Sequence, residues 1–160
     1  MASSRPPVAI LDAAVLVPGG LRDLLLSLAD ASVFRPVWTT QIERETLTHV
    51  VERLVAAGLA PGEARAQGVG VLRNMNEALP DARLATRNWM PKVPLMLNDR
   101  KDRHVLAAAV GAHATHVVTT NIGDFPAYSW PAGVEVLTPD TFTLGLLEQD
   151  AVRVITGLRA

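Results

Sequence analysis

Short β-branched runs that alternate with helical segments restrict the fold of this chain more than any other feature. Strands are expected at residues 8–11, 33–38, 116–120 and 134–137, and helices at 21–31, 40–57, 61–79, 105–110 and from 138 onward. A strand, a helix and a further strand join most readily as a right-handed crossover between parallel strands. The order β, α, β, α, α, loop, α, β, β, α therefore predicts an α/β domain with three layers, α/β/α, around a mainly parallel central sheet.

The composition fits one globular domain. The chain has 160 residues, of which 49% are hydrophobic and 19% charged, which is enough for a substantial core. We expect a single domain over residues 1–160, with its core at about 8–137 and a C-terminal helical extension at about 138–160. The net charge of −1 leaves no general basic field, so a nucleic acid would need a local basic patch.

The absence of cysteine and of long apolar runs bears on the expected cellular location of the protein. Without cysteine, disulfides and thiolate metal sites are excluded, which is compatible with the cytoplasm. No apolar run reaches the length of a membrane span. We therefore expect a cytoplasmic protein that makes no membrane contact.

Residues 98–126, NDRKDRHVLAAAVGAHATHVVTTNIGDFP, carry the strongest chemical signal. Asp102 lies at the start of an expected helix, and Asn121 and Asp124 follow an expected strand. Asp12 follows the first strand of the chain. Because sites in parallel α/β sheets lie beyond the carboxyl ends of the strands, we expect these acids to meet at one edge. Each also has an ordinary structural interpretation, as a helix cap or a turn residue.

Carboxylates that converge repel one another, and a divalent cation removes that repulsion. Ligation by oxygen alone suits Mg²⁺ or Mn²⁺, and such an ion can activate water for in-line cleavage of a phosphodiester. Arg100, Lys101 and Arg103 lie beside Asp102 and could hold phosphates, although a charge run is more often a solvated helix start. Arg22, near the start of an earlier helix, is a further candidate contact.

A second acid could come from the helix at 40–57, where two glutamates compete. Thr40 and Glu43 have the spacing of a capping box, and an ideal helical wheel places Glu43 inside the apolar face, with Glu45 outside it. Glu43 is therefore either a buried acid near the site or a capping partner. The histidines lack zinc-ligand spacing and are expected as surface or core imidazoles: His49, His104, His113 and His116.

Four segments resemble the PIN-domain nucleases, and especially the VapC-like ribonuclease toxins of prokaryotic toxin–antitoxin modules. They are ILDAAVLVP, WTTQIERE, DRKDRHVLAAAV and VVTTNIGDF, in order over roughly residues 8–126. The resemblance implies an Mg²⁺- or Mn²⁺-dependent endoribonuclease that forms a homodimer and is inhibited by a small antitoxin protein. The catalytic metal ligands that it implies are Asp12, Glu45, Asp102 and Asp124, with Thr119 and Asn121 closing the site.

Two departures from the family pattern keep alternatives open. Ala14 stands where the family usually has Asn, and Lys101 stands where relatives often carry a further acid. Ala14 motivates the alternative of a PIN-like RNA-binding or regulatory protein with weak or absent catalysis. A phosphatase that forms an aspartyl phosphate on Asp12 would need a second Asp at position 14, so Ala14 counts strongly against that class.

Overall fold

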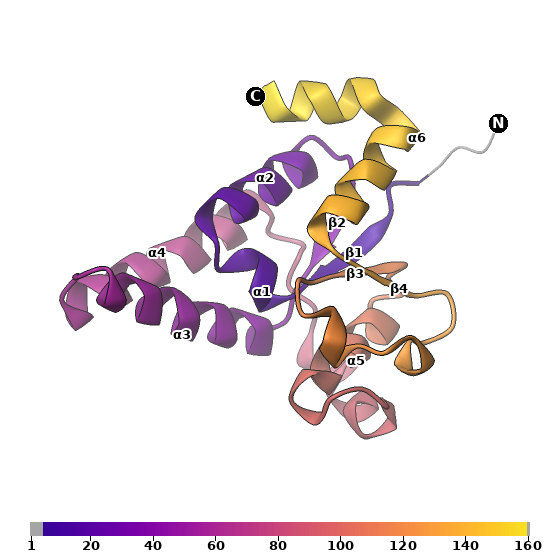
Figure 1. Ribbon diagram of the computed structural model, residues 1–160, viewed down its shortest axis with the longest axis horizontal. Helices are drawn as coiled ribbons and strands as arrows, with labels where there is room; N and C mark the ends of the chain where they lie inside the picture. The colour runs from indigo at the N-terminus through magenta and orange to yellow at the C-terminus, as the bar shows by residue number, and fades with distance from the viewer. Residues whose placement is uncertain (1–4, 160) are drawn as a thin grey trace.

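The computed structural model describes residues 5–159, so the first four residues and the last residue of the expected domain lie outside the described part. Four strands form one sheet in the order β2-β1-β3-β4 (Figure 1). They are β1 (Val8–Leu11), β2 (Arg35–Val37), β3 (His116–Val118) and β4 (Glu135–Leu137). All three pairings are parallel, which confirms the predicted α/β fold with a parallel central sheet.

Helices cover both faces of this sheet. On one side lie α1 (Ala13–Leu16), α2 (Gly19–Asp30) and α6 (Pro139–Arg159), with α2 against β2 and α6 against β4. On the other side α5 (Arg103–Gly111) contacts β1 and β3 (Figure 1). The layers are therefore helix, sheet, helix, as the sequence predicted. No helix among residues 5–159 combines the length and the apolar character needed to cross a membrane.

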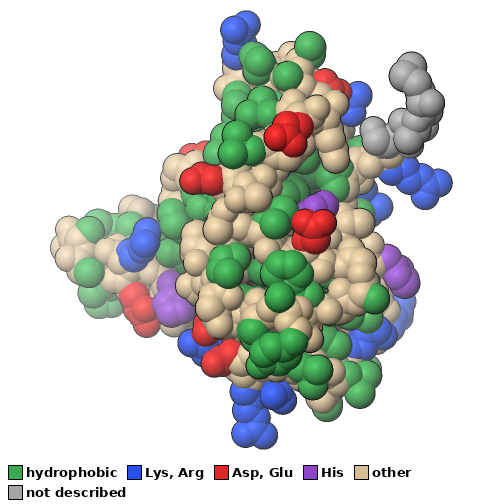
Figure 2. All heavy atoms as spheres, turned by 45° about the vertical axis from the view of Figure 1, so that its right-hand side comes forward, with side chains coloured by type: hydrophobic (Ala, Val, Ile, Leu, Met, Phe, Trp, Pro, Cys, Tyr) green, Lys and Arg blue, Asp and Glu red, His purple; other side chains and the backbone are tan. Residues whose placement is uncertain are grey.

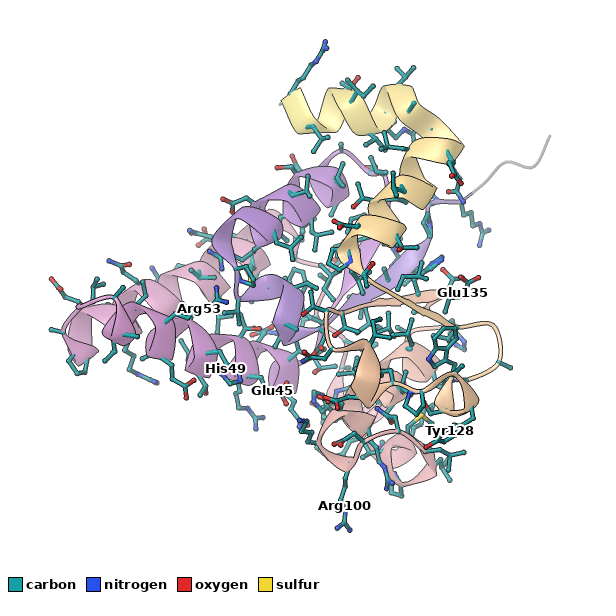
Figure 3. The ribbon with its side chains drawn as sticks, viewed as in Figure 1. Glu45, His49, Arg53, Arg100, Tyr128 and Glu135 are labelled. Atoms are coloured by element: carbon teal, nitrogen blue, oxygen red, sulfur yellow. The ribbon has the colours of Figure 1, made fainter. Side chains whose placement is uncertain are left out.

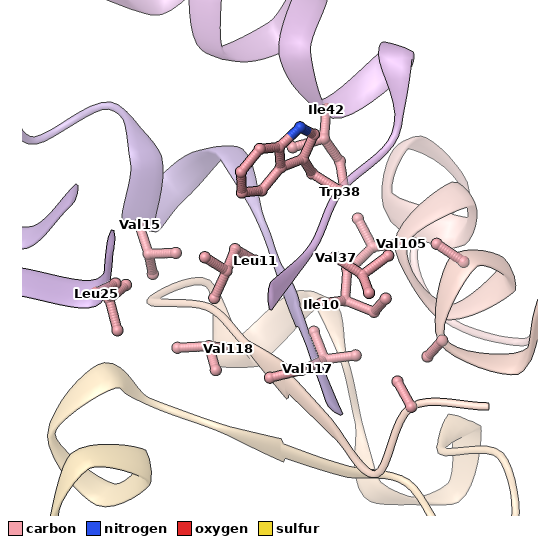
Figure 4. Close-up of a cluster of buried hydrophobic side chains, with 14 of the residues drawn as sticks. Ile10, Leu11, Val15, Leu25, Val37, Trp38, Ile42, Val105, Val117 and Val118 are labelled. Carbon is pink, nitrogen blue, oxygen red and sulfur yellow. The ribbon is translucent and has the colours of Figure 1, made fainter. Parts of the chain in front are cut away.

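The core lies where the two central strands meet these helices (Figure 4). Ile10 and Leu11 of β1 and Val117 and Val118 of β3 are fully buried. Their runs are apolar without alternation because a sheet covered on both faces has no solvent-facing side. Trp38, which is also fully buried, extends the core toward α3.

An α-hairpin extends away from the sheet (left in Figure 1). It consists of α3 (Thr40–Ala56) and α4 (Pro61–Ala78), which contact each other along their length. Gly68 weakens α4 by helix propensity, yet a Cβ there would lie 2.7 Å from Cδ1 of Leu47 and 3.2 Å from Cγ2 of Val51. Gly68 thus allows the two helices to approach closely.

The connections differ from expectation in two places. The expected loop at residues 18–20 is instead the start of α2, which begins at Gly19 after Pro18. The expected loop at 83–97 holds two 3₁₀ turns, η1 (Thr86–Asn88) and η2 (Met90–Leu95), which pack against α5. Further short 3₁₀ turns are η3 (Arg100–Asp102), η4 (Ile122–Asp124) and η5 (Ala127–Ser129). The C-terminal helical extension, α6, is interrupted at Asp150, whose backbone is not helical (φ −156°, ψ 80°), so two helical segments meet there.

Candidate active site

The two central strands define the place of the site. The chain leaves β1 toward β2 and leaves β3 toward β4, which are opposite directions along the sheet. A crevice opens beyond the carboxyl ends of two neighbouring strands where their connections diverge in this way. A cleft of about 810 Å³ lies here, and Asp12, Glu45, Asp102 and Asn121 are among the residues that line it.

Asp12 follows β1 directly and is held from two sides. Its Oδ1 accepts a hydrogen bond from the Ala13 backbone N–H at 2.8 Å, and its Oδ2 accepts one from the Thr119 hydroxyl at 2.7 Å. Thr119 Oγ1 in turn accepts from the Asn121 N–H at 3.0 Å. Burial raises the pKa of Asp12, while these hydrogen bonds act in the opposite direction. The ends of β1 and β3 are therefore tied together through one carboxylate.

Asp102 is buried at the start of α5 without capping that helix. It occupies the N-cap position but makes no side-chain cap hydrogen bond, so the capping interpretation is wrong. Within residues 5–159 its Oδ2 has no hydrogen-bond partner. Burial, a hydrogen bond with Asp124 and the charges of Asp12 and Asp124 raise the pKa of Asp102 to about 7, and the nearby His104 acts against that rise. The surrounding residues thus do little to offset the cost of burying the negative charge of Asp102.

Asp124 lies in η4 beside Asp102, with a cation against it. Lys101 Nζ is 3.5 Å from Asp124 Oδ2, and the charges of Asp124 and Asp102 raise the pKa of Lys101. The acid cluster therefore already contains one neutralising ammonium group.

The four candidate RNA contacts lie in different surroundings. Lys101 lines the cleft. Arg22 donates to the carbonyl oxygens of Leu16 and Val17 at 2.8 and 3.2 Å, and Arg103 donates to a backbone carbonyl oxygen at 3.0 Å. Arg100 is exposed and points away from the body of the protein (Figure 3). Of these four residues, only Lys101 lines the cleft and has a side chain that makes no hydrogen bond to the backbone.

Glu43 and Glu45 of α3 have separate roles. The third glutamate of this helix, Glu52, also lines the cleft and lies 3.0 Å from His49. Glu43 accepts two hydrogen bonds from the Arg83 guanidinium, at 2.7 and 2.8 Å, and does not line the cleft. The predicted capping box is wrong, because the cap of α3 is the Thr39 hydroxyl, which accepts from the Ile42 N–H at 3.1 Å. Glu45 lines the cleft. It is the glutamate of α3 that the resemblance to the PIN-domain nucleases implies as a metal ligand.

The cleft continues along α3 beyond Glu45. His49 and Arg53 also line it, and they follow Glu45 at successive intervals of four residues on one face of the helix (Figure 3). Sequence reasoning did not single out Arg53. The spacing of 45, 49 and 53 on a helix next to a known acid is the signal by which it could have been found.

His104 is the other residue whose position the sequence did not reveal. Its burial agrees with a core imidazole, since it is 3% exposed, but its Nε2 lies 2.9 Å from Glu45 Oε1. The contact joins α5 to α3, which are far apart in sequence, so no local sequence pattern could predict it. Its position two residues after Asp102 was the one hint available.

The donor set fits a hard divalent cation in kind. Its members are carboxylates, one of which has a buried oxygen without a partner in the described residues, and oxygen ligands suit Mg²⁺ or Mn²⁺. Among residues 5–159 no three His, Asp or Glu side chains already have the arrangement needed to hold a metal ion. The Lys101 ammonium, 3.5 Å from Asp124 Oδ2, relieves part of the repulsion that a cation would otherwise relieve.

Comparisons with known proteins give a partial similarity. The chain is 43% identical over 70 residues to the "Putative ribonuclease VapC50" of Mycobacterium tuberculosis, an alignment that covers 41% of this chain and 41% of that protein. It is 38% identical over 94 residues to the thiamine-phosphate synthase of Koribacter versatilis, covering 58% and 39%. The chain thus spans about two fifths of the length of the curated relatives it matches. No protein-family model matches it, and no solved structure matches it.

These two relatives carry the names of unrelated activities, so the choice between them depends on the chemistry of the site. The similarity to a protein named as a ribonuclease agrees with a cleft lined by carboxylates at the carboxyl edge of a parallel sheet. This similarity to a protein named as a ribonuclease extends over part of the chain.

Proposed function

We propose that this chain is a Mg²⁺- or Mn²⁺-dependent endoribonuclease that hydrolyses RNA phosphodiester bonds as the toxin of a toxin–antitoxin pair. The observation that carries the proposal is Asp102, a buried carboxylate without a capping role that shares a cleft with Asp12 and Glu45. A cluster that costs stability in this way is typical of functional sites.

The residues divide into ligands and supports. Asp12, Asp102, Asp124 and Glu45 would hold the cation, which when bound supplies charge neutralisation and an acidified water for attack on phosphorus. Thr119 holds one oxygen of Asp12 and so orients that ligand. Each oxygen of Asp12 retains a further lone pair after its hydrogen bond, so both remain able to bind a cation.

The walls of the cleft suit an RNA strand. Lys101 stands at the acids, and Arg53 lies further along α3, where cationic side chains can contact phosphates on either side of the cleaved bond. The phosphates of RNA are negative and would be repelled by the carboxylates of the cleft. A bound divalent cation would remove that repulsion, which favours RNA binding to the cation-filled site. Base stacking contributes little, since aromatic residues are only 4% of the chain.

We also propose a homodimer and a small antitoxin partner. The similarity to a VapC-named protein supports both. Apolar side chains gather over the second half of α6 (top of Figure 2), where Val152 is 77%, Ile155 44% and Leu158 46% exposed. Exposed apolar surface of this kind is commonly covered by another protein. Light scattering of the purified chain tests the dimer, and a monomer at micromolar concentration would contradict it.

Incubation of the purified protein with assorted RNAs tests the proposed activity. Cleavage is expected with Mg²⁺ or Mn²⁺ and not with a chelator, and Asp102→Asn should remove it. Asp99→Asn is the matched control, because Asp99 is exposed three residues away and does not line the cleft. If the wild-type protein cuts no RNA at high enzyme concentration, the proposal fails, and RNA binding without cleavage would favour the regulatory alternative.

A further inference from the structure

Buried polar atoms without partners concentrate behind the acid cluster. Seven such side-chain atoms occur among residues 5–159, and six of them belong to Trp89, Asn98, Asp102 and His104. Buried polar groups are normally hydrogen-bonded, and exceptions cluster where function requires them. Of these four residues, His104 is the one whose ring nitrogen contacts a second acid of the cleft.

The contact between His104 and Glu45 joins two helices at the site. Nε2 of His104, in α5, lies 2.9 Å from Oε1 of Glu45, in α3, a close polar contact that does not meet the criteria of a hydrogen bond as the side chains stand. The imidazole is 3% exposed, and the Glu45 side chain 32% exposed. Trp89 packs beside the ring, with centroids 6.4 Å apart, so the imidazole has little freedom to turn elsewhere.

We propose that His104 is a positioning residue that donates a hydrogen bond from Nε2 to Oε1 of Glu45 and so holds Glu45 for a divalent cation. The inference rests on the proposed metal site. With Oε1 held by His104, Oε2 is the oxygen of Glu45 that keeps both lone pairs for the cation. A glutamate has three side-chain torsions to fix, so an anchored carboxylate loses less entropy when it binds.

The same arrangement already exists at the other end of the site. Asp12 is held by the Thr119 hydroxyl at 2.7 Å, as Glu45 would be by His104. Carboxylates that bind metals are commonly held by hydrogen bonds from a surrounding layer of side chains. Glu43, on the same helix, has its own partner in Arg83, which separates the two glutamates into a structural one and a positioned one.

Mn²⁺ affinity, measured by calorimetric titration, tests the inference without RNA. His104→Gln places an amide N–H near the position of Nε2, His104→Asn places one near Nδ1, and His104→Leu removes the donor. We expect Gln to bind Mn²⁺ within about threefold of the wild type, and Asn and Leu to bind about 10–100-fold more weakly. If Leu fails to fold, the Gln and Asn pair still compares two polar side chains that differ only in reach.

A double-mutant cycle separates positioning from mere structural support. In a Glu45→Gln background, His104→Leu should cause no further loss of Mn²⁺ affinity, because its effect passes through Glu45. An equal loss in both backgrounds, Gln as weak as Leu, or a wild-type protein that binds no Mn²⁺ would each overturn the inference. Mn²⁺ binding with the expected coupling but no RNA cleavage would refute the proposed ribonuclease and leave the role of His104 standing.

Discussion

Asp102→Asn is expected to make the metal-free protein more stable while it removes metal binding. In the folded state the carboxyl of Asp102 is buried beside Asp12 and Asp124, and its pKa is about 7 instead of 3.8. An asparagine has nearly the same shape as the protonated Asp102 side chain, carries no charge and has an amide N–H that can donate to Asp124. The substitution therefore removes the repulsion between the carboxylate of Asp102 and those of Asp12 and Asp124, which a bound cation would otherwise neutralise.

The size and the sign follow from proton linkage. Between pH 3.8 and about 7 the folded chain keeps the Asp102 proton while the unfolded chain releases it, so the free energy of unfolding falls as pH rises through this window. The full shift would correspond to about 4 kcal/mol at about 1.4 kcal/mol per unit. Water in the open cleft screens the charges, so we expect on the order of 2 kcal/mol above the window.

Urea unfolding with a chelator, at about pH 5 and about pH 8, measures this effect. The stability advantage of Asp102→Asn over the wild type should grow by about 1 kcal/mol between the two conditions. Asp81→Asn, an exposed acid away from the cleft, should show no such growth. Mg²⁺ at the higher pH should then stabilise the wild type and not Asp102→Asn. A difference that is the same at both pH values, or a variant less stable at the higher pH, would refute the reasoning.

Three further substitutions, two of them with a matched control on the same helix, test individual parts of the site. Glu45→Gln should abolish metal-dependent RNA cleavage with little loss of stability. Glu43→Gln should retain cleavage and lower the free energy of unfolding by about 1–3 kcal/mol, because it weakens a bidentate arginine pair. The reverse result would make Glu43 the metal ligand. Ala14→Asn should raise the single-turnover cleavage rate by about tenfold where the amide fits in the cleft, and an unchanged rate would show that no orienting amide is missing. Arg53→Gln should weaken RNA binding and reduce its salt dependence by about one phosphate contact, while Arg44→Gln, on the same helix but away from the cleft, should not; equal effects would exclude a specific contact at Arg53.

The fold was predictable because its signals are local and repeated. The apolar runs at residues 8–11 and 116–118 are short and β-branched or aliphatic, as strands buried on both faces are, and helical segments lie between them. The close packing at Gly68 was not predictable, because it depends on Leu47 of the neighbouring helix. In a single sequence a glycine in a helix looks only like a weak position.

Three of the four acids expected at the site, Asp12, Glu45 and Asp102, line the cleft and Asp124 is not among its lining residues, whereas the partners of these acids were not predicted. Asp12 and Asp102 were placed at the carboxyl edge by topology alone, and both line the cleft. The role of Glu43 was misjudged because its partner, Arg83, lies 40 residues away in sequence, beyond the reach of any helix-cap pattern. The contact of His104 with Glu45 was hidden for the same reason, since it forms only when α5 packs near α3.

A crystal of the protein soaked in Mn²⁺, with anomalous diffraction recorded at the manganese edge, tests the central claim most directly. The claim is that Asp12, Glu45, Asp102 and Asp124 converge on one divalent cation. We expect an anomalous peak in the cleft at about 2.0–2.6 Å from carboxylate oxygens of these residues, with Lys101 displaced from Asp124. A cleft without a peak, or a peak elsewhere that leaves Asp102 protonated against Asp124, would contradict the account.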